Sequence, residues 1–133
     1  MDYVTFGIII DEIVRADGTR WPDKLGGGGP QTAFGMRLWA EAGQVGVAAR
    51  VGGDMPAAAW QWLEASGINT AGVSVTALPT LRARQSLDTD GRRRHEWLVP
   101  GEVISAQLAR SIERLPPAYR GARGWHLGVH PEE

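Results

Sequence analysis

The sequence predicts an α/β fold in which helices flank a mainly parallel sheet. Two apolar runs, Tyr3 to Ile10 and Val45 to Val51, have the continuous hydrophobic character of strands that are buried on both faces. A segment with helical spacing follows each run, the first ending at Gly43 and the second at Gly67. This alternation of strand and helix is typical of α/β domains.

The composition is that of one globular domain and excludes several classes of function. The 133 residues are 43% hydrophobic and 22% charged, which suffices to build a core. A net charge of -1 favours neither a nucleic acid nor an anionic membrane as partner, and the absence of cysteine excludes disulfides, thiolate metal sites and a cysteine nucleophile. Neither a secretory signal nor an apolar run of about 20 residues is found, so we expect a soluble, cytoplasmic protein.

The first half of the chain contains a glycine-rich loop that opens a helix. After a polar, irregular stretch from Arg15 to Lys24, the loop runs from Leu25 to Gln31. Helical spacing then relates Phe34, Leu38, Trp39 and Ala42. The second helix is predicted to start at Asp54 and Pro56 and to continue through Trp60 and Leu63.

The second half predicts an antiparallel ribbon, a helix and a last strand. Short strands are expected at Val73 to Thr76, Arg82 to Leu87 and His95 to Val99, with the turn at Asp90-Gly91. A helix that carries Ile104, Leu108, Ile112 and Leu115 on one face should end at Pro116-Pro117. Trp125 to Val129 is the last predicted strand, and the chain stops where an alternating fold would place another helix. We therefore expect an incomplete domain.

Four consecutive glycines before a helix suit the binding of hydroxyls or phosphates. They let the backbone approach a ligand, and the first turn of the helix offers unpaired N–H groups and a positive dipole end. No Gly-Lys-Ser/Thr follows, and the spacing is not Gly-x-Gly-x-x-Gly, so neither a P-loop nor a dinucleotide fingerprint is present. Taken alone, the loop is equally compatible with a tight turn.

The residues around the loop resemble a known family. The segment from Leu25 to Trp39 resembles the first signature of the PfkB family of carbohydrate kinases. The run from Gly43 to Asp54, the segment Leu63 to Ile68 and the turn Asp90-Gly91-Arg92 match later parts of that family in the same order. The resemblance implies a ribokinase-like fold with a small antiparallel β-lid. Residues 1–133 would be the amino-terminal part of one kinase domain, with lid segments near 12–24 and 73–99.

The resemblance also implies a substrate site and its reaction. Asp11, Gly27, Gly28 and Gln31 would bind the hydroxyls of a sugar or related alcohol, with glutamine standing where the family has asparagine. The family transfers the γ-phosphate of ATP with Mg²⁺, and its base lies in a carboxy-terminal Gly-Ala-Gly-Asp segment that this sequence lacks. We therefore assign no catalytic residue and expect this chain alone to be inactive. The lid of the family often pairs subunits, which implies a homodimer as one arrangement.

Several of these residues also have a structural interpretation. Asp11 could merely start a turn, and Arg92, Arg93 and Arg94 are better explained as a solvated hairpin than as a phosphate site. Among the tryptophans, Trp97 is the candidate for stacking on a sugar, whereas Trp39 and Trp60 are expected to pack in helix cores. His126 and His130 lack a carboxylate at metal spacing, so no zinc site is predicted. His130, just past the last predicted strand, could instead face a ligand crevice.

Two further functional hypotheses remain open. The chain could be a non-catalytic ligand-binding or regulatory module that retains only the sugar cradle. It could also be a fragment that does not fold independently, because its sheet would lack neighbouring strands.

Overall fold

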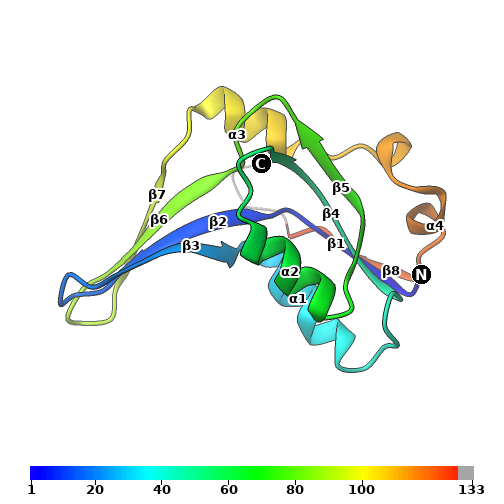
Figure 1. The fold of residues 1–133 in the computed structure, drawn as a ribbon, viewed down its shortest axis with the longest axis horizontal. Helices are drawn as coiled ribbons and strands as arrows, with labels where there is room; N and C mark the ends of the chain where they lie inside the picture. Colours follow the sequence, from blue (N-terminus) through cyan, green and yellow to red (C-terminus); the bar gives the residue numbers. More distant parts are fainter. Residues whose placement is uncertain (129–133) are drawn as a thin grey trace.

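Two four-stranded sheets, joined through the segment around Gly7, organise the protein. The computed structural model describes residues 1–128. Sheet A has the strand order β5-β4-β1-β8 and is parallel throughout, as its registers show. Its strands are β1 (Tyr3–Phe6), β4 (Val45–Gly52), β5 (Asn69–Thr76) and β8 (Gly124–His126). The predicted α/β class is confirmed (Figure 1).

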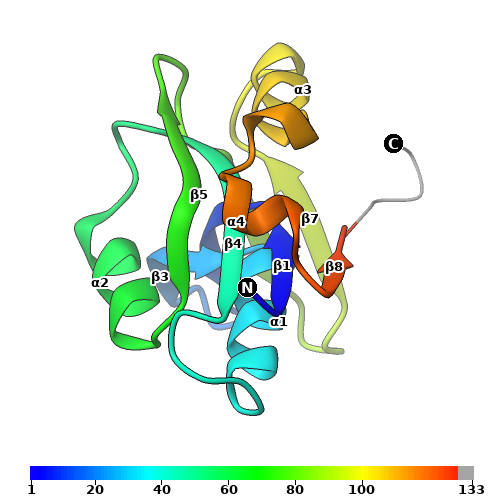
Figure 2. The ribbon, with the colours of Figure 1, turned by 90° about the vertical axis from the view of Figure 1, so that its right-hand side faces the viewer.

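Helices cover both faces of sheet A, as predicted. On one face lie α1 (Gly28–Arg37) and α2 (Ala57–Ala65), and on the other lie α3 (Gly101–Leu108), the 3-10 turn η1 (Ile112–Arg114) and α4 (Pro117–Arg120) (Figure 2). Adjacent residues of a strand point to opposite faces, so each face has its own core. The core on the α1 and α2 face contains Ile8, Ile10, Ala33, Val45, Val47, Val51, Met55, Ala59, Leu63 and Ile68. The core on the other face contains Val4, Phe6, Ala48, Leu115 and Tyr119.

The first predicted strand is two strands that belong to different sheets. Gly7 adopts a positive φ of 86°, and the chain bends there between β1 and β2 (Ile9–Val14). Residues other than glycine rarely adopt this conformation, so the prediction of one strand from Tyr3 to Ile10 overlooked the break that this glycine permits. Asp11 consequently lies within β2 and not at the end of a strand.

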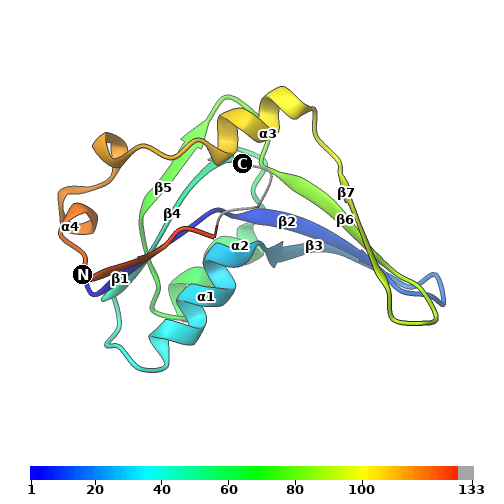
Figure 3. The same cartoon turned by 180° about the vertical axis from the view of Figure 1, so that it is seen from behind.

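Sheet B extends sideways from sheet A and curves away from it (Figures 1 and 3). Its order is β3-β2-β6-β7, with β3 (Arg20–Gly26), β6 (Arg82–Leu87) and β7 (Arg93–Trp97) joining β2. The two outer pairs are antiparallel, whereas β2 and β6 pair in parallel. The predicted hairpin at Asp90-Gly91 is confirmed, since it connects β6 to β7 and Gly91 has a φ of 75°.

Several predicted boundaries are wrong. Residues 20–24, expected to be irregular, form most of β3 because they pair with β2. Residues 73–76, expected in the antiparallel ribbon, belong to β5 and pair in parallel with β4 in sheet A. Helix α1 ends at Arg37, six residues before Gly43. The last strand is Gly124–His126, and residue 129 of the predicted strand lies outside the described residues.

The long amphipathic helix predicted to end at Pro116-Pro117 is three short elements. Helix α3 ends at Leu108, because Ala109 takes an extended ψ of 122°. Pro117 then begins α4, a position where the missing N–H of proline costs no hydrogen bond. Ile112, predicted on the apolar face, is exposed, whereas Leu115 and Tyr119 are buried against sheet A.

Packing of the aromatic side chains was predicted only in part. Trp60 packs against the core on the α1 and α2 face, as expected. Trp39 is 92% exposed, because α1 ends before it and its side chain has no core face to occupy. None of the helices formed by residues 1–128 has the length and apolar character needed to cross a membrane.

Candidate functional site at sheet B and the glycine loop

The two faces of sheet B differ in chemistry. On one face, Glu12, Arg84 and Glu96 lie side by side across three strands. The Arg84 guanidinium contacts Glu12 at 2.7 Å and Glu96 at 3.3 Å. Arg20 contacts Glu12 at 2.8 Å, and hydrogen bonds from Arg84 and Arg20 hold the pKa of Glu12 below its usual range. These charges are paired, so this face resembles a solvated, stabilising surface.

The opposite face of sheet B carries Asp11 among uncharged and aromatic side chains. The strand registers place Asp11 beside Ala83, Ala83 beside Trp97, and Gln85 beside His95. Side chains of residues paired across a sheet point to the same face, so these five residues share one surface. The ring of His95 meets that of Trp97 edge-on, with 4.8 Å between centroids.

Asp11 is half-buried and only weakly paired. Burial raises the pKa of its carboxyl above the ordinary value, although the Gln85 side chain and the charges of His95 and Arg93 act in the opposite direction. Gln85 donates a hydrogen bond from Nε2 to the Asp11 carboxylate at 3.3 Å. The other side-chain atom of Gln85, Oε1, is buried without a hydrogen-bond partner. The Gln85 oxygen and the Asp11 carboxylate thus lie close together and can accept further hydrogen bonds, as in a site that binds hydroxyl groups.

The glycine loop approaches Asp11 through Gly26. A Cβ atom added to Gly26 would lie 2.0 Å from Asp11 Oδ2, so any other residue would displace the carboxylate. Gly27 caps α1 with a φ of 83°, a conformation that favours glycine. The structure therefore places the Asp11 carboxylate beside the loop that opens α1.

The remaining predicted residues are placed differently. Gly28 is the first residue of α1, and its added Cβ would contact nothing within 4 Å, so a side chain is sterically tolerated there. Gln31 is exposed and lines a groove with Asp23, Phe34 and Trp62, and Asp11 is not among the residues that line this groove. The structure thus brings Asp11 against Gly26, the residue before Gly27, and Gln31 lines a different groove.

Sequence reasoning missed Gly26, Gln85 and His95. Gly26 belongs to the glycine run, but only its distance to Asp11 shows why it must be glycine. Gln85 lies two residues after Ala83, and His95 lies two residues before Trp97. Because side chains alternate along a strand, all four could have been placed on one face once the register of the hairpin was known.

A hydrogen-bonded junction holds sheet B against sheet A. Asp54, predicted to start α2, instead accepts hydrogen bonds from the backbone N and the hydroxyl of Thr80, at 2.8 and 2.7 Å. The first residue before α2 is Pro56, which supplies no side-chain cap. Burial would raise the pKa of Asp54, but these bonds and the charge of Arg82 outweigh it and hold the pKa below its ordinary value. Arg82 of β6 also contacts Asp23 of β3 at 2.8 Å, so it links these two strands of sheet B to this turn.

No group of three or more metal-ligating side chains occurs within residues 1–128. His126 lies on β8 with Nδ1 buried and without a hydrogen-bond partner. His130, the other histidine singled out in the sequence, lies outside the described residues.

The arrangement of sheets A and B is that of a ribokinase-like α/β domain. Several solved structures are similar to the chain in fold. They include a ribokinase from Cryptococcus neoformans var. grubii serotype A in complex with ADP, with 22% identity, a TM-score of 0.62 and coverage of 72% of this chain and 33% of that one. A PfkB protein from Polaromonas sp. JS666 has 24% identity, a TM-score of 0.64 and coverage of 94% and 44%. A fructokinase from Vibrio cholerae O395 has 21% identity, a TM-score of 0.63 and coverage of 87% and 39%.

These likenesses confirm the predicted fold. At identities of this size they concern the fold alone, and the chain spans less than half the length of each of the three structures. Neither a protein-family model nor a curated protein matches the sequence.

Proposed function

We propose that residues 1–133 form the acceptor-binding part of a kinase that transfers the γ-phosphate of ATP to a hydroxyl of a sugar or related alcohol. The observation that carries the proposal is the half-buried Asp11 carboxylate beside the glycine loop at the start of α1. A carboxylate accepts hydrogen bonds from two neighbouring hydroxyls of a polyol, and the N–H groups of the first helical turn can donate to others. The ribokinase-like fold supports the same assignment.

In this proposal each residue has a distinct role. Asp11 orients the acceptor, Gln85 supports the carboxylate from β6, and Gly27 and Gly28 offer backbone N–H groups. Trp97 provides an apolar wall on the same face as Asp11. Gln31 would contact a ligand that extends from the loop toward the groove of Phe34 and Trp62. Sheet B would act as the lid over the acceptor; it contains most of the expected lid segments near 12–24 and 73–99, except residues 73–76, which belong to sheet A.

ATP and Mg²⁺ have no assigned residues in the described part of the chain. Residues 1–128 contain no group of three or more metal-ligating side chains, and no step of phosphoryl transfer is derived through them. We propose that ATP, Mg²⁺ and the base belong to a part of the parent kinase outside these residues. The chain alone is then expected to bind the acceptor without phosphorylating it, and ATP-dependent phosphorylation by purified residues 1–133 would contradict this.

Titration of the isotope-labelled chain with a panel of pentoses, hexoses and polyols, followed by NMR, tests the acceptor site. A true acceptor should shift the amide signals of residues 26–28 and 83–85 in a saturable manner. Asp11→Asn should weaken binding about tenfold or more, because a charged hydrogen bond contributes about 1.5–3 kcal/mol. Asp90→Asn makes the same chemical change at the hairpin tip and serves as the control. Equal affinities of the two variants would refute the assignment of Asp11.

A further inference from the structure

A second cavity lies on the face of sheet A opposite α1 and α2. It lies between strands β4 and β5 and the segment that runs from α3 to η1, is partly open to solvent, and has a volume of about 190 Å³. Its lining contains none of the residues of the proposed acceptor site, namely Asp11, Gly27, Gly28 and Gln31. The cavity is therefore separate from the function proposed above.

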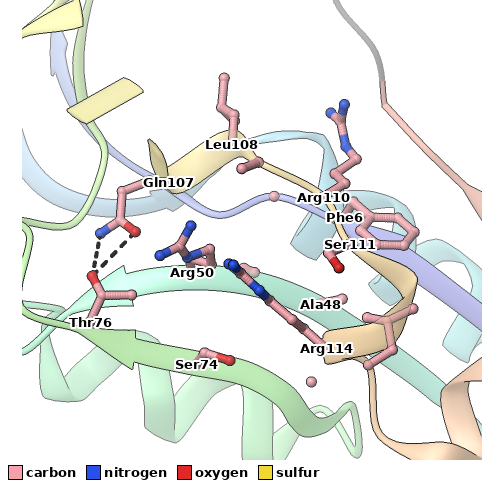
Figure 4. Close-up of a pocket in the computed structure, with 15 residues that line it drawn as sticks. Phe6, Ala48, Arg50, Ser74, Thr76, Gln107, Leu108, Arg110, Ser111 and Arg114 are labelled. Atoms are coloured by element: carbon pink, nitrogen blue, oxygen red, sulfur yellow. Dashed lines mark hydrogen bonds between the residues drawn. The ribbon is translucent and has the colours of Figure 1, made fainter. Parts of the chain in front are cut away.

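Arginine side chains from different elements converge on this cavity. Arg50 reaches it from β4 and Arg114 from η1 (Figure 4). Arg110, from the segment between α3 and η1, also belongs to the lining, but it points away from the other two and donates a hydrogen bond to the Gly128 carbonyl. The side chains of Ser74, Thr76, Gln107 and Ser111 complete the polar part of the lining. The residues that line the cavity include three arginines and no carboxylate.

Two of these arginines form no ion pair with a carboxylate within residues 1–128, although the charge of Arg114 helps to lower the pKa of the neighbouring Glu113. Arg50 donates a hydrogen bond from a terminal guanidinium nitrogen to the carbonyl of Ala106, at 2.7 Å, which uses one of its five N–H donors. Neither Arg50 nor Arg114 forms an ion pair with a carboxylate among these residues. Glu113, the neighbour of Arg114, accepts a hydrogen bond from Ser111 and is not part of the lining.

Guanidinium groups that face one another repel unless an anion lies between them. Their planar donor arrays match the oxygens of a phosphate, which they bind in a bidentate manner. The volume of the cavity limits the size of its ligand. Pockets that bind drug-sized molecules measure roughly 300–1,000 Å³, so this cavity is smaller than they are. A cavity of about 190 Å³ fits a single phosphate group and not a nucleotide.

We propose that this cavity is an anion site that binds one phosphate group, as inorganic phosphate or as the head of a small phosphomonoester. The guanidinium groups of Arg50 and Arg114 donate hydrogen bonds to the phosphate oxygens, and the hydroxyl of Ser74 donates a further hydrogen bond. Because Arg50 also holds the carbonyl of Ala106, an occupied site would tie β4, α3 and η1 together.

NMR titration of residues 1–133 at constant ionic strength tests the site, with inorganic phosphate in one arm and glycerol phosphate in the other. Saturable shifts at residues 72–76 and 110–114 are expected in at least one arm. Saturation in both arms means that phosphate alone suffices, and saturation by glycerol phosphate alone identifies a monoester site. Lack of saturation in both arms at tens of millimolar, or equal shifts with chloride, overturns the proposal.

Variants locate the binding. Arg50→Gln and Arg114→Gln should each weaken phosphate binding about tenfold or more, since each removes a charged hydrogen-bond donor. Arg92→Gln, which changes an exposed arginine of the β6–β7 hairpin, should leave the affinity unchanged. If Arg50→Gln perturbs the fold in circular dichroism, the exposed Arg114 still provides the test. Unchanged affinity of Arg114→Gln, or equal losses in Arg92→Gln, would overturn the assignment.

Discussion

Gly29→Ala probes the contact on which the glycine loop depends. An added Cβ would lie 2.2 Å from the carbonyl oxygen of Gly7 and 2.8 Å from that of Phe6. Both are backbone atoms at the end of β1, so they cannot move aside as the end of a flexible side chain would. Relief of the overlap requires α1 to shift away from sheet A.

The expected change in the free energy of unfolding is the sum of three contributions. Overpacking a buried site costs about 1–3 kcal/mol, and a backbone overlap of this size belongs at the upper end. Thr5 donates a buried hydrogen bond to the Gly29 carbonyl at 2.8 Å, and its loss costs about 1 kcal/mol. Alanine gains about 1 kcal/mol over glycine through helix propensity. The free energy of unfolding should therefore fall by about 3 kcal/mol.

Urea and thermal denaturation of residues 1–133, each followed by circular dichroism, measure this change. The melting temperature should fall on the order of 10 °C. Gly28→Ala is the matched control, because it lies one residue earlier in the same helix and its Cβ would meet nothing within 4 Å. Its stability should be unchanged or up to about 1 kcal/mol higher. A Gly29→Ala protein within about 0.5 kcal/mol of the parent, or equal losses in both variants, would refute the reasoning.

Three further predictions concern titratable groups. Burial raises the pKa of Asp11 in the folded state, so ionisation of Asp11 destabilises the fold above the unfolded pKa of about 3.9. Asp11→Asn should therefore unfold at a higher urea concentration than the parent at pH 7. This difference should vanish below about pH 4. Thr80→Val removes both side-chain bonds to Asp54 and Gly52 and should cost about 1–3 kcal/mol at neutral pH. Because the pKa of Asp54 is depressed, its bonds stabilise the fold above about pH 3.9 and are lost in acid, so this cost should shrink as the urea midpoint is measured at lower pH. Burial raises the pKa of Tyr119 to about 12, so ultraviolet titration of Tyr3→Phe should show no tyrosinate below about pH 11, and early ionisation would contradict the packing of Tyr119.

The alternation of strands and helices could be predicted because each element has its own periodicity. The apolar run of β4, the glycine stop after α2 and the Asp90-Gly91 turn are local signals, and the structure confirms them. Local signals failed where a neighbouring element decides the outcome. The segment 20–24 looked irregular, yet it becomes a strand because β2 offers it a hydrogen-bonding edge.

In the candidate site too, the residue types could be recognised from local sequence, whereas their arrangement could not. Asp11 and the glycine loop were identifiable as residue types suited to binding hydroxyls, and the resemblance to a sugar-kinase family pointed to the same residues. Their proximity required the tertiary structure, because Gly7 turns the chain and sends β2 into a second sheet. The bend also puts Asp11 on the surface that carries Gln85 and His95, residues more than 70 positions away.

Sequence patterns alone were enough to establish the α/β class, the glycine loop before a helix and the hairpin, because propensity and hydrophobic periodicity act over a few residues. Pairing between distant strands decided the rest: the division into two sheets, the two contrasting faces of sheet B, and the arginine-lined cavity behind sheet A. Register and crossover depend on how the whole chain buries its apolar surface, and no local pattern contains that information.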